Sequence, residues 1–269
     1  MSAIRPAAVA GTFYPGEASS LAAEVAAYIA EAPPGPNGVR APKAIIAPHA
    51  GYIYSGPIAA SIYARLTSLR GRLERVVLAG PAHRVYVSGV AIPAAEAFAS
   101  PLGAVELDAG ALRELQKLPF VEVSDRAHAL EHSLEVHVPF LQAALGPFRL
   151  VPLVVGDANP SEMAQVFDIL WGGDETLIVV SSDLSHYLPY EAARARDRDT
   201  AGAIISLEPT LVPEEACGAA PINGLLVAAR RRGMRAELVD LRNSGDTAGD
   251  RSRVVGYGAF AFHVGEPET

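Results

Sequence analysis

The sequence predicts an α/β protein, a single three-layer α/β/α domain over residues 1–269 around a mostly parallel or mixed sheet. Short apolar runs rich in β-branched residues recur along the chain, and the stretches between them carry apolar residues at helical spacing. A strand that is apolar at successive positions, without alternation, is typical of a sheet buried on both faces. Because such strands alternate with helices almost throughout, we expect helices to cover both faces of the sheet.

Composition excludes several classes of partner and location. A chain of 269 residues can bury a core that needs no disulfide or metal in order to fold. The net charge of −8 disfavours nucleic acid and anionic membrane as partners, because both require a basic surface. The chain has one cysteine, no apolar run as long as a membrane span, and no signal-peptide core at its start. We therefore expect a cytoplasmic protein that binds a small molecule or a peptide, and leave a homo-oligomer open.

The first half of the chain alternates helices and strands without a clear linker. Leu21, Val25 and Ile29 share one helical stripe, which predicts a helix over residues 18–32. A Pro/Gly-rich stretch at 33–42 predicts a loop before the first buried strand. The remaining elements expected in this half are strands at 43–47, 75–79, 89–92 and 121–123 and helices at 55–69, 108–118 and 131–145.

The second half contains the stretch that most clearly indicates a site. The apolar run 177–180 predicts a buried strand, and serines, Asp183 and His186 follow it. In an open α/β sheet, ligands bind outside the carboxyl ends of the strands. An oxygen ligand and an imidazole at that edge indicate half of a metal or acid–base site, with His186 as a candidate acid–base group. The elements expected here are strands at 149–155, 176–181, 236–241 and 254–262 and helices at 161–171, 189–207 and 221–232.

Three of the seven histidines occupy equivalent positions. His49, His83 and His186 each come a few residues after an apolar strand. If those strands are parallel, their carboxyl ends meet at one edge of the sheet, and the three imidazoles converge there with Asp183. One histidine after a strand is usually a turn residue, but three that converge with an acid indicate a metal or acid–base site.

Cys217 is a further candidate for this site. By default the lone cysteine of such a chain is a small buried apolar residue. Here it precedes Gly218 and a predicted helix start. Because a helix N-terminus favours the thiolate, which is the form that binds metals, we expect a lowered cysteine pKa and a functional role.

The segment 131–137 looks like a metalloprotease helix but has the wrong spacing. Those helices place two histidines four residues apart on one face. His132 and His137 are five residues apart, which separates them by about 140° around a regular helix. We therefore expect His132 to face the cleft and His137 to point elsewhere, and we expect Glu131 and His132 to support the site or contact substrate.

Seven short motifs run across nearly the whole chain. They are Tyr14-Pro15, PHAGYIYSG at 48–56, GPAHR at 80–84, EHSLEVHVPF at 131–140, SSDLSHY at 181–187, CG at 217–218 and YGAFAF at 257–262. In this order they resemble the Memo family (mediator of cell motility; in prokaryotes, AmmeMemoRadiSam system protein B).

The resemblance implies a fold similar to that of class III extradiol dioxygenases, whose site binds non-haem Fe(II). It implies that His49, His83 and Cys217 are metal ligands and that Asp183 and His186 belong to the same site, where we expect them to be catalytic. The residues expected to support the ligands or contact substrate are Tyr52, Glu131, His132 and Ser182.

Three functions remain open at this point. The first is a metal-dependent oxidoreductase of dioxygenase type. The second is a protein that binds a peptide or a metal on the same fold without turnover, and the third is a metal-dependent hydrolase. Two histidines with a carboxylate suit iron, whereas two histidines with a thiolate suit copper or zinc, so we expect iron or copper and leave zinc open. The chain has no P-loop, dinucleotide-binding or GxSxG motif, which disfavours nucleotide and serine-hydrolase chemistry.

Overall fold

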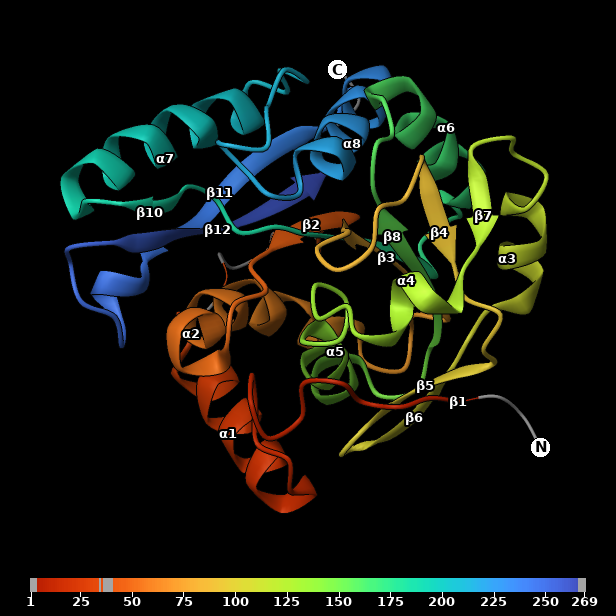
Figure 1. Cartoon of the computed structure of the whole chain (residues 1–269), viewed down its shortest axis with the longest axis horizontal. Coiled ribbons are helices and arrows are strands. Elements are labelled where there is room, and N and C mark those ends of the chain that lie inside the picture. The colour runs from red at the N-terminus through yellow and green to blue at the C-terminus, as the bar shows by residue number, and fades with distance from the viewer. Residues whose placement is uncertain (1–3, 34, 36–40, 266–269) are drawn as a thin grey trace.

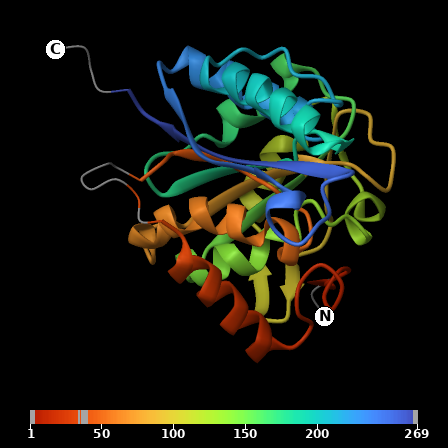
Figure 2. The same cartoon turned by 90° about the vertical axis from the view of Figure 1, so that its left-hand side faces the viewer.

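The structure is a computed structural model that describes residues 4–33, 35 and 41–265. Within these residues the main sheet has nine strands, in the order β10-β12-β2-β9-β3-β8-β4-β7, with β11 paired to the other side of β12. Helices cover both faces of this sheet, so the predicted three-layer α/β architecture is confirmed (Figures 1 and 2).

The centre of the sheet is parallel and buried, as its apolar sequence predicts. It consists of β2 (Ala44–Ala47), β9 (Thr176–Ser181), β3 (Arg75–Pro81) and β8 (Arg149–Val155), each parallel to its neighbour. Nearly every residue of these strands is buried, which is why they lack the alternation of a half-exposed strand. Their carboxyl ends therefore lie at one edge.

The outer strands make the sheet mixed. Beside β2, the long strand β12 (Val254–His263) runs antiparallel and also pairs with β11 (Arg235–Asn243) and β10 (His186–Leu188). On the far side, β4 (Val90–Ile92) runs antiparallel to β8 and parallel to β7 (Val121–Val123).

The helices fall into two layers. One face of the sheet carries α6, α7 and α8, and the other carries α2 and α5 with α1 outside them (Figure 2). Among the described residues, no helix has the length and apolar composition that crossing a bilayer requires. The helices are α1 (Ala18–Glu31), α2 (Tyr52–Tyr63), η1 (Ala64–Leu69), α3 (Ala109–Leu115), α4 (Asp125–Ala129), α5 (His137–Leu145), α6 (Pro160–Leu170), α7 (Tyr190–Ile205), α8 (Ala219–Arg231) and η2 (Ser244–Asp246).

A second, three-stranded sheet was not predicted. It joins β1 (Ile4–Arg5) to the hairpin of β5 (Ala97–Ser100) and β6 (Gly103–Glu106). Strand β1 has only two residues, and the two hairpin strands are short and rich in Ala and Gly, which are poor strand formers, so their sequence carries little strand signal.

The prediction of one helix over 131–145 was wrong. Helix α5 (His137–Leu145) begins six residues later, and the residues before it form turns. Pro139 explains the difference. In a longer helix it would be interior, where it could not donate to the carbonyl of residue 135, whereas the first turn of a helix tolerates proline well. His132 therefore lies on a loop.

Candidate metal centre

The loops after three parallel strands meet in one cleft. His49, His83 and Asp183 each lie two residues beyond the end of their strand, β2, β3 and β9 respectively. They line a cleft of 780 Å³ together with His132 and His186. The histidines and the acid that were predicted from the strand pattern therefore lie together in the structure, although they are distant in the sequence.

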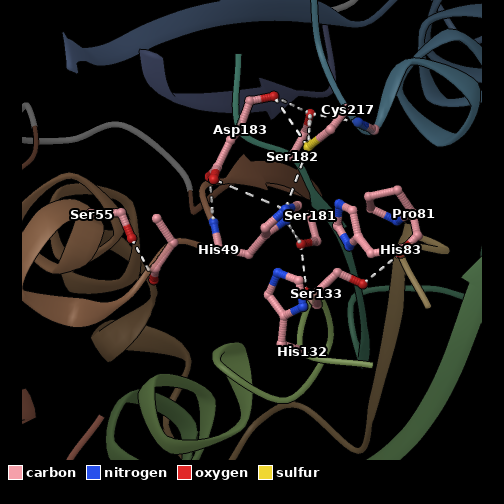
Figure 3. Close-up of polar contacts among 12 residues, drawn as sticks. His49, Ser55, Pro81, His83, His132, Ser133, Ser181, Ser182, Asp183 and Cys217 are labelled. Atoms are coloured by element: carbon pink, nitrogen blue, oxygen red, sulfur yellow. Dashed lines mark hydrogen bonds and ion pairs between the residues drawn. The ribbon is translucent and has the colours of Figure 1, made fainter. Parts of the chain in front are cut away.

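Three imidazoles of this cleft form a cluster that could hold a metal ion. One ring nitrogen from each of His49, His83 and His132 lies within 4.8 Å of the other two (Figure 3). The ring centroids are 5.1 Å apart for His49 and His83, and 4.7 Å apart for His83 and His132. His132 was expected in a supporting role, but its position makes it a potential ligand.

Cys217 lies beside this cluster rather than inside it. Its sulfur is 3.4 Å from His49 Nε2, but it is not among the ligand atoms that lie within 4.8 Å of one another. The expectation of a lowered thiol pKa was wrong. Helix α8 does begin just after Cys217, but burial, reinforced by the charge of Asp183, raises the thiol pKa to about 12.

His83 is held by a carboxylate. Its Nδ1 lies 2.9 Å from Glu131 Oε1, and its backbone N–H donates to Glu131 Oε2 at 2.6 Å. The backbone N–H groups of His132 and Ser133 also donate to Oε1, at 2.9 and 3.0 Å. Burial alone would raise the pKa of Glu131, but these hydrogen bonds outweigh it and lower the pKa to about 2. Glu131 is therefore an ionised support for two of the clustered histidines.

His49 is held by a neutral network. Its Nδ1 lies 2.6 Å from the hydroxyl of Ser181, the last residue of β9. The same hydroxyl lies 2.8 Å from His137 Nε2, and His137 Nδ1 lies 2.8 Å from the Tyr63 hydroxyl. His137 thus lies below the cleft and outside the cluster, whereas His132 lines the cleft, so the expected orientations of the two are confirmed.

Two titratable groups complete the polar part of the cleft. Asp183 Oδ1 accepts the backbone N–H of His49 at 2.7 Å, and Oδ2 lies 4.0 Å from His49 Nε2. Burial raises the pKa of Asp183 to about 7, although backbone N–H groups donate to it. His186 lines the wall, its Nδ1 lies 2.8 Å from the Leu184 carbonyl oxygen, and burial lowers its pKa.

Two further predicted residues lie outside the cleft lining. Tyr52 is buried, and its hydroxyl donates to the Val136 carbonyl at 2.7 Å, so it supports the loop after His132 and does not reach substrate space. Tyr54, two residues later, lines the cleft instead. Ser182 is also buried, and its hydroxyl accepts the backbone N–H of Gly218 at 2.9 Å, which holds the residue after Cys217.

Residues to which no role was assigned from the sequence also shape the site. The carboxylate of Glu135 accepts the Arg5 guanidinium, the Tyr14 hydroxyl at 2.6 Å, and the backbone N–H groups of residues 8–9 at 2.8 Å. Arg5 also donates to the backbone carbonyl of Glu131 at 2.7 Å. The N-terminal segment therefore clamps the loop that carries the third histidine. A glutamate within an apolar motif was the available sequence signal.

Cleft arginines were missed as well. Arg84 and Arg253 both line the cleft. The guanidinium of Arg253 lies over the ring of Tyr187, 5.1 Å from its centroid. The position of Arg84 directly after His83 could have indicated its place, whereas nothing in the sequence places Arg253.

The fold and the histidine cluster define an α/β protein with a candidate metal centre at the carboxyl edge of its sheet. The family model described as Memo-like protein matches residues 5–261, and the chain belongs to the Memo family. Two similar proteins are the MEMO1 family proteins of Ignicoccus hospitalis and Aquifex aeolicus. The first is 37% identical over 96% of this chain and 98% of its own length, and the second is 38% identical over 96% and 99%.

A solved structure shares the fold. The uncharacterized protein JW3007 from Escherichia coli K12 superposes with a TM-score of 0.51, covering 81% of this chain and 99% of that one. The two sequences are 18% identical, so this likeness concerns the fold alone.

Proposed function

We propose that the chain is a metal-dependent oxidoreductase of dioxygenase type, with iron or copper held by His49, His83 and His132. The observation that carries the proposal is the cluster of three imidazole nitrogens within 4.8 Å of one another, in a cleft that also holds an acid. The three histidines come from separate loops, so their convergence is a property of the fold.

The donor set suits such an ion. Imidazole binds iron, copper and zinc in its neutral form. Burial lowers the pKa of His49 well below its ordinary value and that of His132 to about 4, so both are neutral at physiological pH. His132 Nδ1 is buried without a hydrogen-bond partner, although Glu131 Oε1 lies 3.3 Å away.

Cys217 is a candidate for a soft fourth donor on the His49 side of the cluster. Two atoms bound to one zinc ion at about 2.0 and 2.3 Å, with tetrahedral angles, lie about 3.5 Å apart. The sulfur of Cys217 and Nε2 of His49 are 3.4 Å apart. Because the thiol is protonated in the free protein, its use as a ligand requires the loss of that proton.

The other cleft residues supply proton acceptors. When bound, iron or copper would supply the redox chemistry of an oxygenase. Asp183, with a pKa of about 7, can accept and release a proton near neutrality. In His186, Nδ1 faces the Leu184 carbonyl, which only accepts, so Nδ1 carries the proton and Nε2 is free to accept another.

Separate loading with three metals tests the proposal. The protein is purified without chelators, its metal content is measured, and portions are loaded with Fe(II), Cu(I) or Zn(II). We expect oxygen uptake with catechol as the probe for the iron- or copper-loaded protein, and none for the zinc-loaded one, because zinc has no redox chemistry. His83→Ala, treated identically, controls for reactions of free metal.

The same experiment separates the alternatives. Hydrolysis of p-nitrophenyl acetate by the zinc-loaded protein, without oxygen uptake in any form, would replace the proposal with a hydrolase. Tight metal binding without either reaction would leave a binding protein.

A further inference from the structure

Ser181 is the meeting point of three polar groups beneath the cleft. It is fully buried at the end of β9 and lies between His49 and Ser133 (Figure 3). Its hydroxyl lies 2.6 Å from the Ser133 carbonyl, 2.6 Å from His49 Nδ1 and 2.8 Å from His137 Nε2. A hydroxyl has one proton to donate and two lone pairs that accept, so these three contacts use its full capacity.

The identity of the Ser133 acceptor fixes the direction of every bond. A backbone carbonyl can only accept, so the single proton of Ser181 is donated to it. Both imidazoles must then donate to Ser181, His49 through Nδ1–H and His137 through Nε2–H. A neutral imidazole has one N–H, so His49 Nε2 carries a lone pair. This is the nitrogen that lies 3.4 Å from the sulfur of Cys217.

The direction of the hydrogen bond between His137 and Tyr63 follows from the same argument. Since the proton of His137 is on Nε2, its Nδ1 must accept from the Tyr63 hydroxyl at 2.8 Å. Burial lowers the pKa of His137 to about 3 and raises that of Tyr63 well above its ordinary value. Both therefore keep the neutral forms that these bonds require, and the network ends in the core.

We infer that Ser181 and His137 are positioning residues that hold His49 as its Nδ1–H tautomer, with the lone pair of Nε2 turned to the metal site. The metal in this statement rests on the proposed function, but the tautomer belongs to the protein alone. Ligand histidines are commonly oriented by a carboxylate or a carbonyl. Here the orienting group is the hydroxyl of Ser181, whose own proton is donated to the Ser133 carbonyl. His137 donates to the second lone pair of this hydroxyl, so the hydroxyl cannot rotate to donate to His49.

The tautomer can be measured directly in the metal-free chain. Long-range ¹H–¹⁵N spectra of protein labelled at its seven histidines distinguish protonated from bare ring nitrogens, and His49→Gln assigns the signals of His49. We expect protonated Nδ1 and bare Nε2 at pH 7. In Ser181→Ala we expect a mixture of tautomers and zinc binding weakened about 10- to 100-fold. The control, Ser133→Ala, removes another buried hydroxyl but leaves the carbonyl in place, and should not change the tautomer.

A second pair of variants keeps the inference testable if Ser181→Ala does not fold. His137→Gln places an amide N–H where His137 has Nε2–H, and His137→Leu does not. We expect the glutamine variant to keep the His49 tautomer and the zinc affinity of the wild type. We expect the leucine variant to show a mixture of His49 tautomers and a weaker zinc affinity.

Two results would overturn the inference. One is a proton on His49 Nε2 in all or part of the wild-type protein, and the other is an unchanged tautomer in both Ser181→Ala and His137→Leu. If the tautomer is as stated and no metal binds, the proposed function fails while the inference stands. If metal binds and the wild type shows mixed tautomers, the inference fails alone.

Discussion

His49 and His83 both line the cleft, and each is oriented through its Nδ1, but by a different kind of acceptor. His83 is partly exposed and donates to the ionised carboxylate of Glu131, whereas His49 is buried and donates to the neutral hydroxyl of Ser181. A buried carboxylate needs several donors, and the backbone N–H groups of His83, His132 and Ser133 serve this purpose. Ser181, at the end of a buried strand, needs no charge compensation. A carboxylate raises the basicity of a ligand as well as orienting it, whereas a hydroxyl mainly orients.

Removing the imidazole of His49 or of His83 should produce the largest effect on metal binding. The two substitutions should differ in how much they lower the free energy of unfolding. We expect His49→Ala and His83→Ala each to weaken zinc binding by more than about 100-fold, since each removes a ligand of the proposed metal centre, whereas loss of a supporting group costs about 10- to 100-fold. In the metal-free protein, we expect His49→Ala to lower the free energy of unfolding by about 1–3 kcal/mol, because Ser181 loses a buried partner. His83→Ala should lower it by less than His49→Ala does, because three backbone N–H groups still donate to the carboxylate of Glu131 after the imidazole is removed. Calorimetric titration and urea denaturation measure the two quantities, and equal costs in stability would contradict the comparison.

The charge of Glu131 is the next most sensitive feature. We expect Glu131→Gln to weaken zinc binding about 10- to 100-fold, because the substitution removes the negative charge 2.9 Å from His83 Nδ1. Glu122→Gln, the same substitution at an exposed residue of β7, is the matched control and should leave binding unchanged. An equal response of the two variants would show that the carboxylate of Glu131 does not act on the metal.

Substituting Cys217, whose sulfur lies 3.4 Å from His49 Nε2, tests whether the thiol binds the metal beside His49. Sulfur is a soft ligand, so we expect Cys217→Ser to weaken copper or zinc binding about 10-fold or more and iron binding far less. Competition titrations with each metal measure the three affinities. A uniform loss across all three metals would assign Cys217 a packing role.

A buried histidine outside the cluster isolates the effect of burial. Burial lowers the pKa of His128 to about 4, although its Nε2 bonds the Ala91 carbonyl at 3.0 Å. Between about pH 6.5 and pH 4, the unfolded chain binds a proton at His128 that the folded chain does not. The stability contributed by the neutral form is therefore present above the unfolded pKa and falls as the pH drops through this window.

His128→Gln should remove this contribution while keeping an N–H near the Ala91 carbonyl. Within the window, we expect the free energy of unfolding of the variant to fall less steeply with decreasing pH than that of the wild type, by about 1.4 kcal/mol per pH unit. Above the window, the two proteins should show the same pH dependence. Urea denaturation at pH 7 and pH 5 makes the comparison. Parallel pH dependences of the variant and the wild type would contradict it.

The sequence was sufficient for the parts of the site that regular strands position. His49, His83 and Asp183 follow apolar runs at the carboxyl ends of parallel strands, and this pattern is local and strong. It was insufficient for the third histidine. The helical spacing of 131–145 hid a loop, and the consequence of Pro139 for the helix start was overlooked.

The direction of individual side chains was the other feature of the site that the sequence did not predict. Tyr52 and Tyr54 stand two residues apart at the start of α2, on different sides of the helix, so the motif alone does not show which faces the cleft. The roles of Ser181 and His137 depend on contacts between β9 and α5, which are 44 residues apart in the chain. Hydrogen-bond partners at such separations are set by tertiary packing and leave no local pattern.

The location of a bound ion tests the central claim most directly. A crystal of the iron- or zinc-loaded protein, measured at the absorption edge of the metal, gives that location from the anomalous signal. We predict one strong peak in the cleft, at about 2.0–2.2 Å from a ring nitrogen of each of His49, His83 and His132. A peak outside the cleft, or a fully loaded protein with no peak at these three nitrogens, would contradict the assignment of this cluster as the metal centre.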